Sequence, residues 1–139
     1  KLLRPNPGVW VPEKDLTRFT PSLWLAEPGA ECSFEFSGSG FCLYTLSGPG
    51  CGSFEIEVDG VKHTHCCFDP YSRGWRINPF FAARALDRQM QHHVTLRVLS
   101  ERPDKTAILA KVGGADLIEK MPEAFQPINL VIGGVLIED

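Results

Sequence analysis

Several features that would point to common functions are missing from this 139-residue sequence. No apolar run approaches the roughly 18 residues that span a bilayer, so we expect no membrane partner. Lys and Arg number 14 against 17 Asp and Glu, without the basic excess that binding to a phosphate backbone requires, so we expect no nucleic-acid partner. Neither a Gly-x-Ser-x-Gly elbow nor a Gly-Asp-Ser block is present, so the sequence does not predict a serine-hydrolase nucleophile.

What is present is the composition of an ordinary globular domain, with 43% hydrophobic and 22% charged residues. A chain of this length fits one domain, residues 1–139. We expect residues 1–27 to be irregular and packed on that domain, because prolines interrupt regular structure there. Short extended pieces are expected near 9–11 and 18–20. The chain begins at Lys1 rather than Met, so we expect a mature secreted product or part of a longer protein.

The five cysteines predict free thiols rather than a disulfide framework. An odd count leaves at least one thiol without an intramolecular partner. Adjacent Cys66 and Cys67 point to opposite faces of a strand, and Cys32 and Cys42 fall in apolar strand patterns that suit small core residues. We therefore expect all five to be unpaired.

Period-two alternation of apolar and polar residues predicts most of the secondary structure. The expected strands cover residues 31–36, 41–46, 53–58, 61–68, 80–83, 92–99, 106–112 and 128–137. Asp59-Gly60 is a strong hairpin turn, Gly133-Gly134 suggests a bulge or close backbone approach, and 115–121 suits one or two helical turns. Many short strands without strand–helix–strand alternation predict an all-β fold, a jelly-roll β-sandwich of about eight antiparallel strands.

Four segments, in the order in which they occur, carry a family resemblance: residues 28–41, 52–60, 86–99 and 132–138. They include a strand rich in Phe and Gly, a hairpin ending in Val58-Asp59-Gly60, and the strand from His93 to Leu99. This order resembles the galactose-binding-like jelly-roll domain that precedes the catalytic domain in SGNH/GDSL-type carbohydrate esterases.

The resemblance implies a non-catalytic accessory module of a carbohydrate-active, esterase-like protein. Such a module would bind glycan weakly or brace the catalytic domain, so its partner would be carbohydrate or a covalently linked catalytic domain. The implied location is periplasmic or extracellular. Because the Gly-Asp-Ser block is absent, the resemblance carries no esterase activity over to this chain.

The segment from Asp69 to Asn78 is the candidate ligand-binding loop, since sugar recognition pairs flat aromatic faces with fixed polar groups. Tyr71 and Trp75 could supply the aromatic platform. The hydrogen-bonding groups would come from Asp69, Arg73, Arg76 and Asn78. Two alternatives remain open: Trp75 could close over the core with both arginines anchoring the loop, or the loop could dock a neighbouring catalytic domain.

A metal site has one candidate, on the predicted strand that contains His63, His65 and Cys67. Alternation places these three side chains on one face, but zinc requires three or four converging ligands and the sequence indicates no fourth. Jelly-roll modules often hold a structural calcium, and the scattered acidic residues do not place one here. We therefore expect no cofactor, with a structural calcium left open and without a predicted position.

Glu55, Glu57 and Asp59 support a rival hypothesis, a small glycoside hydrolase. Paired carboxylates that flank a sugar can divide the nucleophile and acid roles between them. Alternating glutamates are also what any solvated strand face shows, and Asp59 falls in a turn. A third hypothesis is a purely structural domain that binds other proteins.

Overall fold

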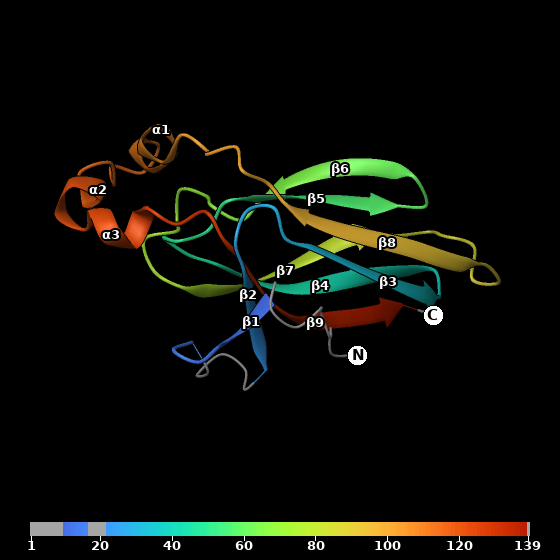
Figure 1. Cartoon of the computed structure of the whole chain (residues 1–139). Coiled ribbons are helices and arrows are strands. Elements are labelled where there is room, and N and C mark those ends of the chain that lie inside the picture. Colours follow the sequence, from blue (N-terminus) through green and yellow to red (C-terminus); the bar gives the residue numbers. More distant parts are fainter. Residues whose placement is uncertain (1–9, 17–21, 139) are drawn as a thin grey trace.

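The computed structural model describes residues 10–16 and 22–138, which form two antiparallel sheets stacked face to face (Figure 1). One sheet has the strand order β1 (Trp10–Glu13), β2 (Leu23–Ala26), β9 (Leu130–Glu138), β4 (Gly40–Ser47), β7 (Arg76–Ala83). The other has the order β3 (Glu31–Ser37), β8 (Gln91–Val98), β5 (Ser53–Val58), β6 (Val61–Cys66). The predicted all-β sandwich is confirmed, and the described residues contain nine strands where about eight were expected.

The main core lies between the sheets and follows the predicted alternation. On β5, Phe54, Ile56 and Val58 point inward, while Glu55 and Glu57 face outward. The inward side chains of β3 and β8 complete this half of the core. Facing them from the five-stranded sheet are Phe41, Leu43, Leu130, Ile132 and Val135. β4 is buried along nearly its whole length, as its unbroken apolar sequence predicts.

Two glycine signals in the sequence are confirmed. Asp59 and Gly60 both have positive φ angles, 50° and 86°, which suits the two-residue turn of a twisted β5–β6 hairpin. Between β4 and β9 the pairing shifts, because Tyr44 faces Gly134 while Thr45 faces Ile132. The skipped residue, Gly133, lies so close to Tyr44 that a Cβ there would be 3.0 Å from the tyrosine ring. Gly133 therefore forms the expected bulge at a close backbone approach.

The strand predicted over 106–112 is wrong, since this segment contains the helix α1 (Lys105–Ala110). The Asp104 side chain caps the helix by accepting a hydrogen bond from the Ala107 N–H at 3.0 Å. The helical turns expected over 115–121 are confirmed by α2 (Leu117–Lys120), and α3 (Pro122–Phe125) follows directly. All three helices gather at one end of the sandwich (Figure 1).

The edges of the five-stranded sheet also differ from expectation. β7 begins at Arg76 rather than at Phe80, and it contains Pro79. An edge strand tolerates proline because one side of its backbone has no strand to donate to, and β7 pairs only with β4. Residues 10–13 form β1, which overlaps the extended piece expected near 9–11, and residues 23–26 form β2 where irregular chain was predicted. The extended piece predicted at 18–20 lies outside the described residues.

The five cysteines are free thiols, as predicted, and four of them are buried. Burial raises the pKa of Cys51 to about 12 and raises the pKa of Cys67 well above its ordinary value. These thiols therefore act as small core residues. Within the described part of the chain, no helix has the length and apolar character needed to cross a membrane.

Candidate functional site

The loop between β6 and β7 lies at the same end of the sandwich as the three helices (Figure 1). Asp69 organises it: its Oδ1 accepts a hydrogen bond from the Tyr71 N–H at 2.8 Å, and the Ser72 hydroxyl accepts one from the Asp69 N–H at 2.9 Å. The other carboxylate oxygen of Asp69 pairs with the Arg76 guanidinium. Asp69 and Arg76 thus bind each other and hold the loop in shape, as short aspartate-centred turns do.

Trp75 is half-buried and packs against the main core and against a second apolar cluster, formed by Leu16, Leu23, Leu46 and Val131. Its ring lies on Gly48, in the β4–β5 connection, so closely that a Cβ at position 48 would be 2.3 Å from the ring. This packing favours the alternative in which Trp75 closes over the core. It leaves Trp75 with less free ring surface than the sequence interpretation assumed.

The two side chains of the candidate loop that project most freely are Tyr71, which is 62% exposed, and Arg73. The aliphatic part of Arg73 runs beside the helices, since a Cβ on Gly114 would lie 3.4 Å from Arg73 Cδ. Asn78 lies within β7 opposite the buried Thr45, whose hydroxyl donates to the Asn78 carbonyl at 2.5 Å. The loop therefore exposes one aromatic ring, Tyr71, and one cation, Arg73. Its other predicted residues are partly buried.

The metal candidates are not brought together as a ligand set. His65 stacks on Phe80 with ring centroids 3.9 Å apart, and burial lowers the pKa of His65, so its neutral form is favoured. His63 is exposed and Cys67 is buried. Over residues 10–16 and 22–138, no group of three His, Cys, Asp or Glu side chains is arranged to hold a metal ion.

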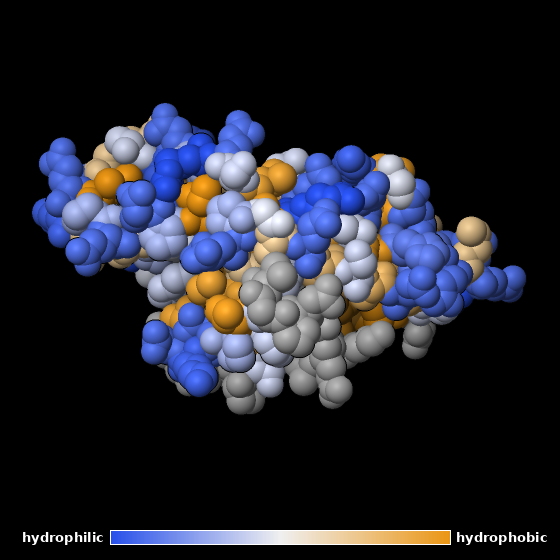
Figure 2. Space-filling model, viewed as in Figure 1, coloured by the Kyte–Doolittle hydropathy of each residue, from blue (hydrophilic) through white to orange (hydrophobic). Residues whose placement is uncertain are grey.

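The carboxylates of the glycosidase hypothesis are engaged by one guanidinium. Arg97 donates through Nη1 to Glu55 and to Glu57, each at 3.0 Å, and through Nε to Glu31 at 2.5 Å. These ion pairs raise the pKa of Arg97. They lie on the polar outer face of the four-stranded sheet, and hydrophilic side chains predominate over β3 and β8 (Figure 2). The arrangement gives Glu55 and Glu57 a structural role across three strands.

Asp59, which is exposed, makes a polar contact with the buried His92 that the sequence did not predict. Its Oδ2 lies 2.6 Å from Nδ1 of His92, and its Oδ1 accepts the His93 N–H at 2.9 Å. The other ring nitrogen of His92 lies 2.7 Å from the Asp87 carbonyl. With an acceptor at each nitrogen the protonated ring is favoured, so the Asp59 carboxylate, followed by the Asp87 carbonyl, raises the pKa of His92.

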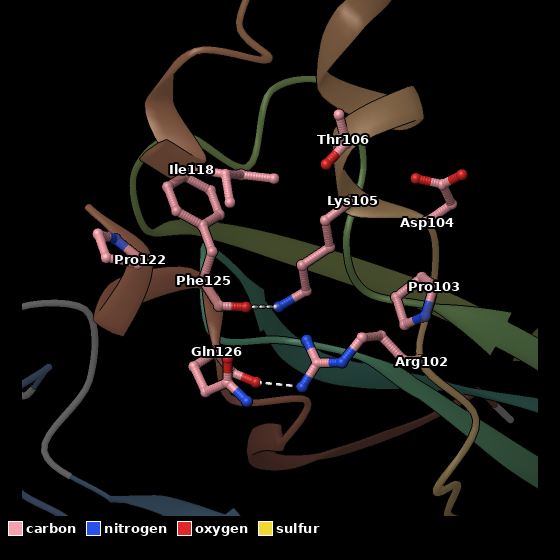
Figure 3. Close-up of a pocket in the computed structure, with 9 residues that line it drawn as sticks. All are labelled: Arg102, Pro103, Asp104, Lys105, Thr106, Ile118, Pro122, Phe125 and Gln126. Carbon is pink, nitrogen blue, oxygen red and sulfur yellow. Dashed lines mark hydrogen bonds between the residues drawn. The ribbon is translucent and has the colours of Figure 1, made fainter. Parts of the chain in front are cut away.

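The helical end contains a second feature that sequence reasoning missed, a cavity of about 360 Å³ beside the buried Lys105 (Figure 3). The Lys105 ammonium donates to three backbone carbonyls: Pro49 at 2.7 Å, Phe125 at 2.9 Å and Pro127 at 2.6 Å. It thereby ties α1 to the β4–β5 connection and to the segment that follows α3. Burial lowers the pKa of Lys105 to about 8. Nothing in the local sequence marks this lysine as buried.

Comparison with known proteins shows the fold. No protein-family model matches the chain, and no curated protein matches it. Among solved structures, a two-domain esterase (CEX) active on acetylated mannans matches over 99% of this chain, with a TM-score of 0.61 and 14% identity. The same esterase co-crystallized with mannopentaose matches over 94%, with a TM-score of 0.60 and 14% identity.

The matched region is only part of each esterase chain. This chain spans 36% and 33% of the two esterase chains, about a third of their length. A carbohydrate-binding module, CBM36 in complex with calcium and xylotriose, aligns over 96% of this chain and 90% of its own, with a TM-score of 0.48 and 6% identity. The esterase matches identify the architecture as a β-sandwich that also occurs within a carbohydrate-active enzyme.

Proposed function

We propose that this chain is a non-catalytic accessory module that binds glycan and belongs to a polypeptide with an esterase domain. The observation that carries the proposal is Tyr71, an exposed aromatic ring on a loop that hydrogen bonds hold in one shape. The fold that this chain shares with about a third of a two-domain esterase supports the proposed esterase domain in the same polypeptide. Since polymeric glycans are met outside the cytoplasm, the proposed location is periplasmic or extracellular.

The geometry suits stacking against a single sugar ring. The Tyr71 ring offers an apolar face to the C–H side of a pyranose, and the guanidinium of Arg73, two residues further on, offers hydrogen-bond donors to the hydroxyls. Asp69 and Arg76 hold the backbone between them, so binding orders few additional groups. With one aromatic ring exposed, we expect weak binding, with a Kd of about 1 mM, which corresponds to a binding free energy of about −4 kcal/mol.

The proposal is tested by calorimetric or NMR titration with manno- and xylo-oligosaccharides. We expect Tyr71→Ala to weaken binding at least 10-fold and Arg73→Ala to weaken it less. Met90→Ala and Arg88→Ala are the matched controls, because both residues are exposed on the β7–β8 loop at the opposite end (Figure 1). Unchanged affinity in Tyr71→Ala would remove this loop as the glycan site.

A bracing role beside a catalytic domain has its own support on the outer face of the five-stranded sheet. Ile77 and Leu136 are 42% and 63% exposed there, and Val11 is 49% exposed on the same face. An exposed apolar surface of this kind suits a permanently linked neighbour. The parent coding sequence tests this role, since a Gly-Asp-Ser block shortly after Asp139 would supply the esterase domain.

A further inference from the structure

The cavity at the helical end has the lining of a small-molecule site. Its volume of about 360 Å³ falls at the lower end of the range for such pockets, about 300–1,000 Å³, which suits one sugar unit better than a long chain. One wall is apolar: Ile118 and Pro122 line it (Figure 3), while the Phe125 ring beside Ile118 is buried against Phe68. An apolar wall of this kind can cover the C–H face of a pyranose.

The opposite side of the cavity is positively charged. The Arg102 guanidinium donates through Nη2 to the Gln126 carbonyl at 2.5 Å, and the ammonium of the buried Lys105 lies beside it (Figure 3). The carboxylate among the lining residues is Asp104, which accepts the Ala107 N–H and is directed away from Arg102. Two cations therefore share one side of the cavity, and Lys105 has already committed its three donors to carbonyls.

From this arrangement we infer that the cavity binds the uronic acid unit of an acidic glycan. The sugar carboxylate pairs with Arg102, whose planar fork matches a carboxylate and whose guanidinium has five N–H donors. The sugar ring lies against Ile118 and Pro122. Thr106 and Gln126, also in the lining, are placed to meet ring hydroxyls. The inference goes beyond the proposed function, because it stands on the cavity and not on the Tyr71 loop.

The buried charge of Lys105 adds a reason for anion binding. Among the residues that the structure describes, no carboxylate pairs with its ammonium, and burial, followed by the charge of Arg102, lowers the Lys105 pKa. An anion bound beside both cations would offset their mutual repulsion, which acts between the buried ammonium of Lys105 and the exposed guanidinium of Arg102. Binding should therefore weaken as salt is added, since screening reduces exactly this attraction at the open cavity mouth.

Calorimetric titration with glucuronic acid, with glucose and with a uronate-containing oligosaccharide tests the inference. We expect the wild-type protein to bind glucuronic acid at least 10-fold more tightly than glucose. Arg102→Gln should lose that preference, Arg102→Lys should keep part of it, and the exposed control Arg88→Gln should keep all of it. Tighter binding of the oligosaccharide than of free glucuronic acid identifies a glycan as the ligand, and equal or weaker binding overturns the glycan assignment.

Three results would overturn the site itself: equal affinity for glucose and glucuronic acid, no measurable binding of the acid, or full preference retained in Arg102→Gln. Circular dichroism and thermal melting establish that each variant is folded, and Arg102→Lys, which keeps a donor for the Gln126 carbonyl, serves if Arg102→Gln does not fold. Tyr71→Ala separates the two proposals, because it should leave glucuronic acid binding unchanged. Loss of that binding in Tyr71→Ala would place the acid on the loop and not in the cavity.

Discussion

Replacing Lys105 by Met tests whether one buried ammonium holds the helical end to the sandwich. The change keeps the aliphatic stem but removes the donor from the carbonyls of Pro49, Phe125 and Pro127. Each buried carbonyl left unpaired costs about 1–3 kcal/mol, and water entering from the adjacent cavity recovers part of that. We expect Lys105→Met to lower the free energy of unfolding by about 2–4 kcal/mol in chemical denaturation.

The matched control is Lys62→Met, since Lys62 is exposed on β6 and should change stability by less than about 0.5 kcal/mol. Hydrogen exchange gives a second readout, because Lys105→Met should speed exchange in α1 and α3 before it affects β5 or β8. A Lys105→Met protein as stable as the Lys62→Met protein would refute the anchoring role.

The stability difference between wild type and Lys105→Met should also depend on pH, with a defined sign. Burial lowers the pKa of Lys105 to about 8, against 10.5 for an exposed lysine, so between these values the unfolded chain holds more protons. The stability contributed by Lys105 therefore rises with pH through this window, by up to about 3 kcal/mol. Buried thiols such as Cys51 act in the opposite direction in both proteins. The difference between wild type and Lys105→Met should widen from pH 7 to pH 10; a constant or narrowing difference would contradict the burial of its charge.

Two further predictions concern other contacts. Gly48→Ala places a methyl group against the Trp75 ring, so we expect about 1–3 kcal/mol of destabilisation and altered tryptophan fluorescence, whereas wild-type stability would show that the ring is not seated there. For His92, whose pKa is raised by Asp59 and then by the Asp87 carbonyl, the added stability is complete below pH 6.5 and is lost as pH rises through the folded pKa. The difference in unfolding free energy between wild type and His92→Gln should therefore narrow as pH rises above 6.5. An NMR titration that gives His92 a pKa below 6.5 would be inconsistent with both contacts.

The sheets could be predicted from sequence because their signal is local. Each strand of the sandwich buries one face, so apolar residues recur at every second position, as Phe54, Ile56 and Val58 do on β5. The hairpin turn at Asp59-Gly60 is local for the same reason, since its positive φ angles are a property of those two residues. The pairing order of the strands needed the structure.

The helix α1 was mistaken for a strand because a short apolar run fits either structure. Residues 107–110, Ala-Ile-Leu-Ala, bury mainly Leu109, and one buried side chain shows no period. The sequence signal for a helix was Asp104 at the N-cap position, three residues before Ala107. Tertiary packing of Leu109 on Phe68 and Phe125 then secures a helix too short to be stable alone.

The Tyr71 loop was a candidate from sequence, but the cavity was not, and neither showed its dependence on the β4–β5 connection, which is remote in sequence from both. In this connection, Gly48 packs against the Trp75 ring, and the carbonyl of the next residue, Pro49, accepts a hydrogen bond from Lys105. A Cβ on Gly50 would lie 3.6 Å from Trp75 and 3.6 Å from Pro127, so the connection is packed between the binding loop and the helical end. Gly48 is required there because a Cβ would meet the Trp75 ring at 2.3 Å, whereas a Cβ on Gly50 would make ordinary contacts with both elements. The Tyr71 loop and the Arg102 cavity are therefore supported by the same few residues, and a perturbation of this connection should loosen both.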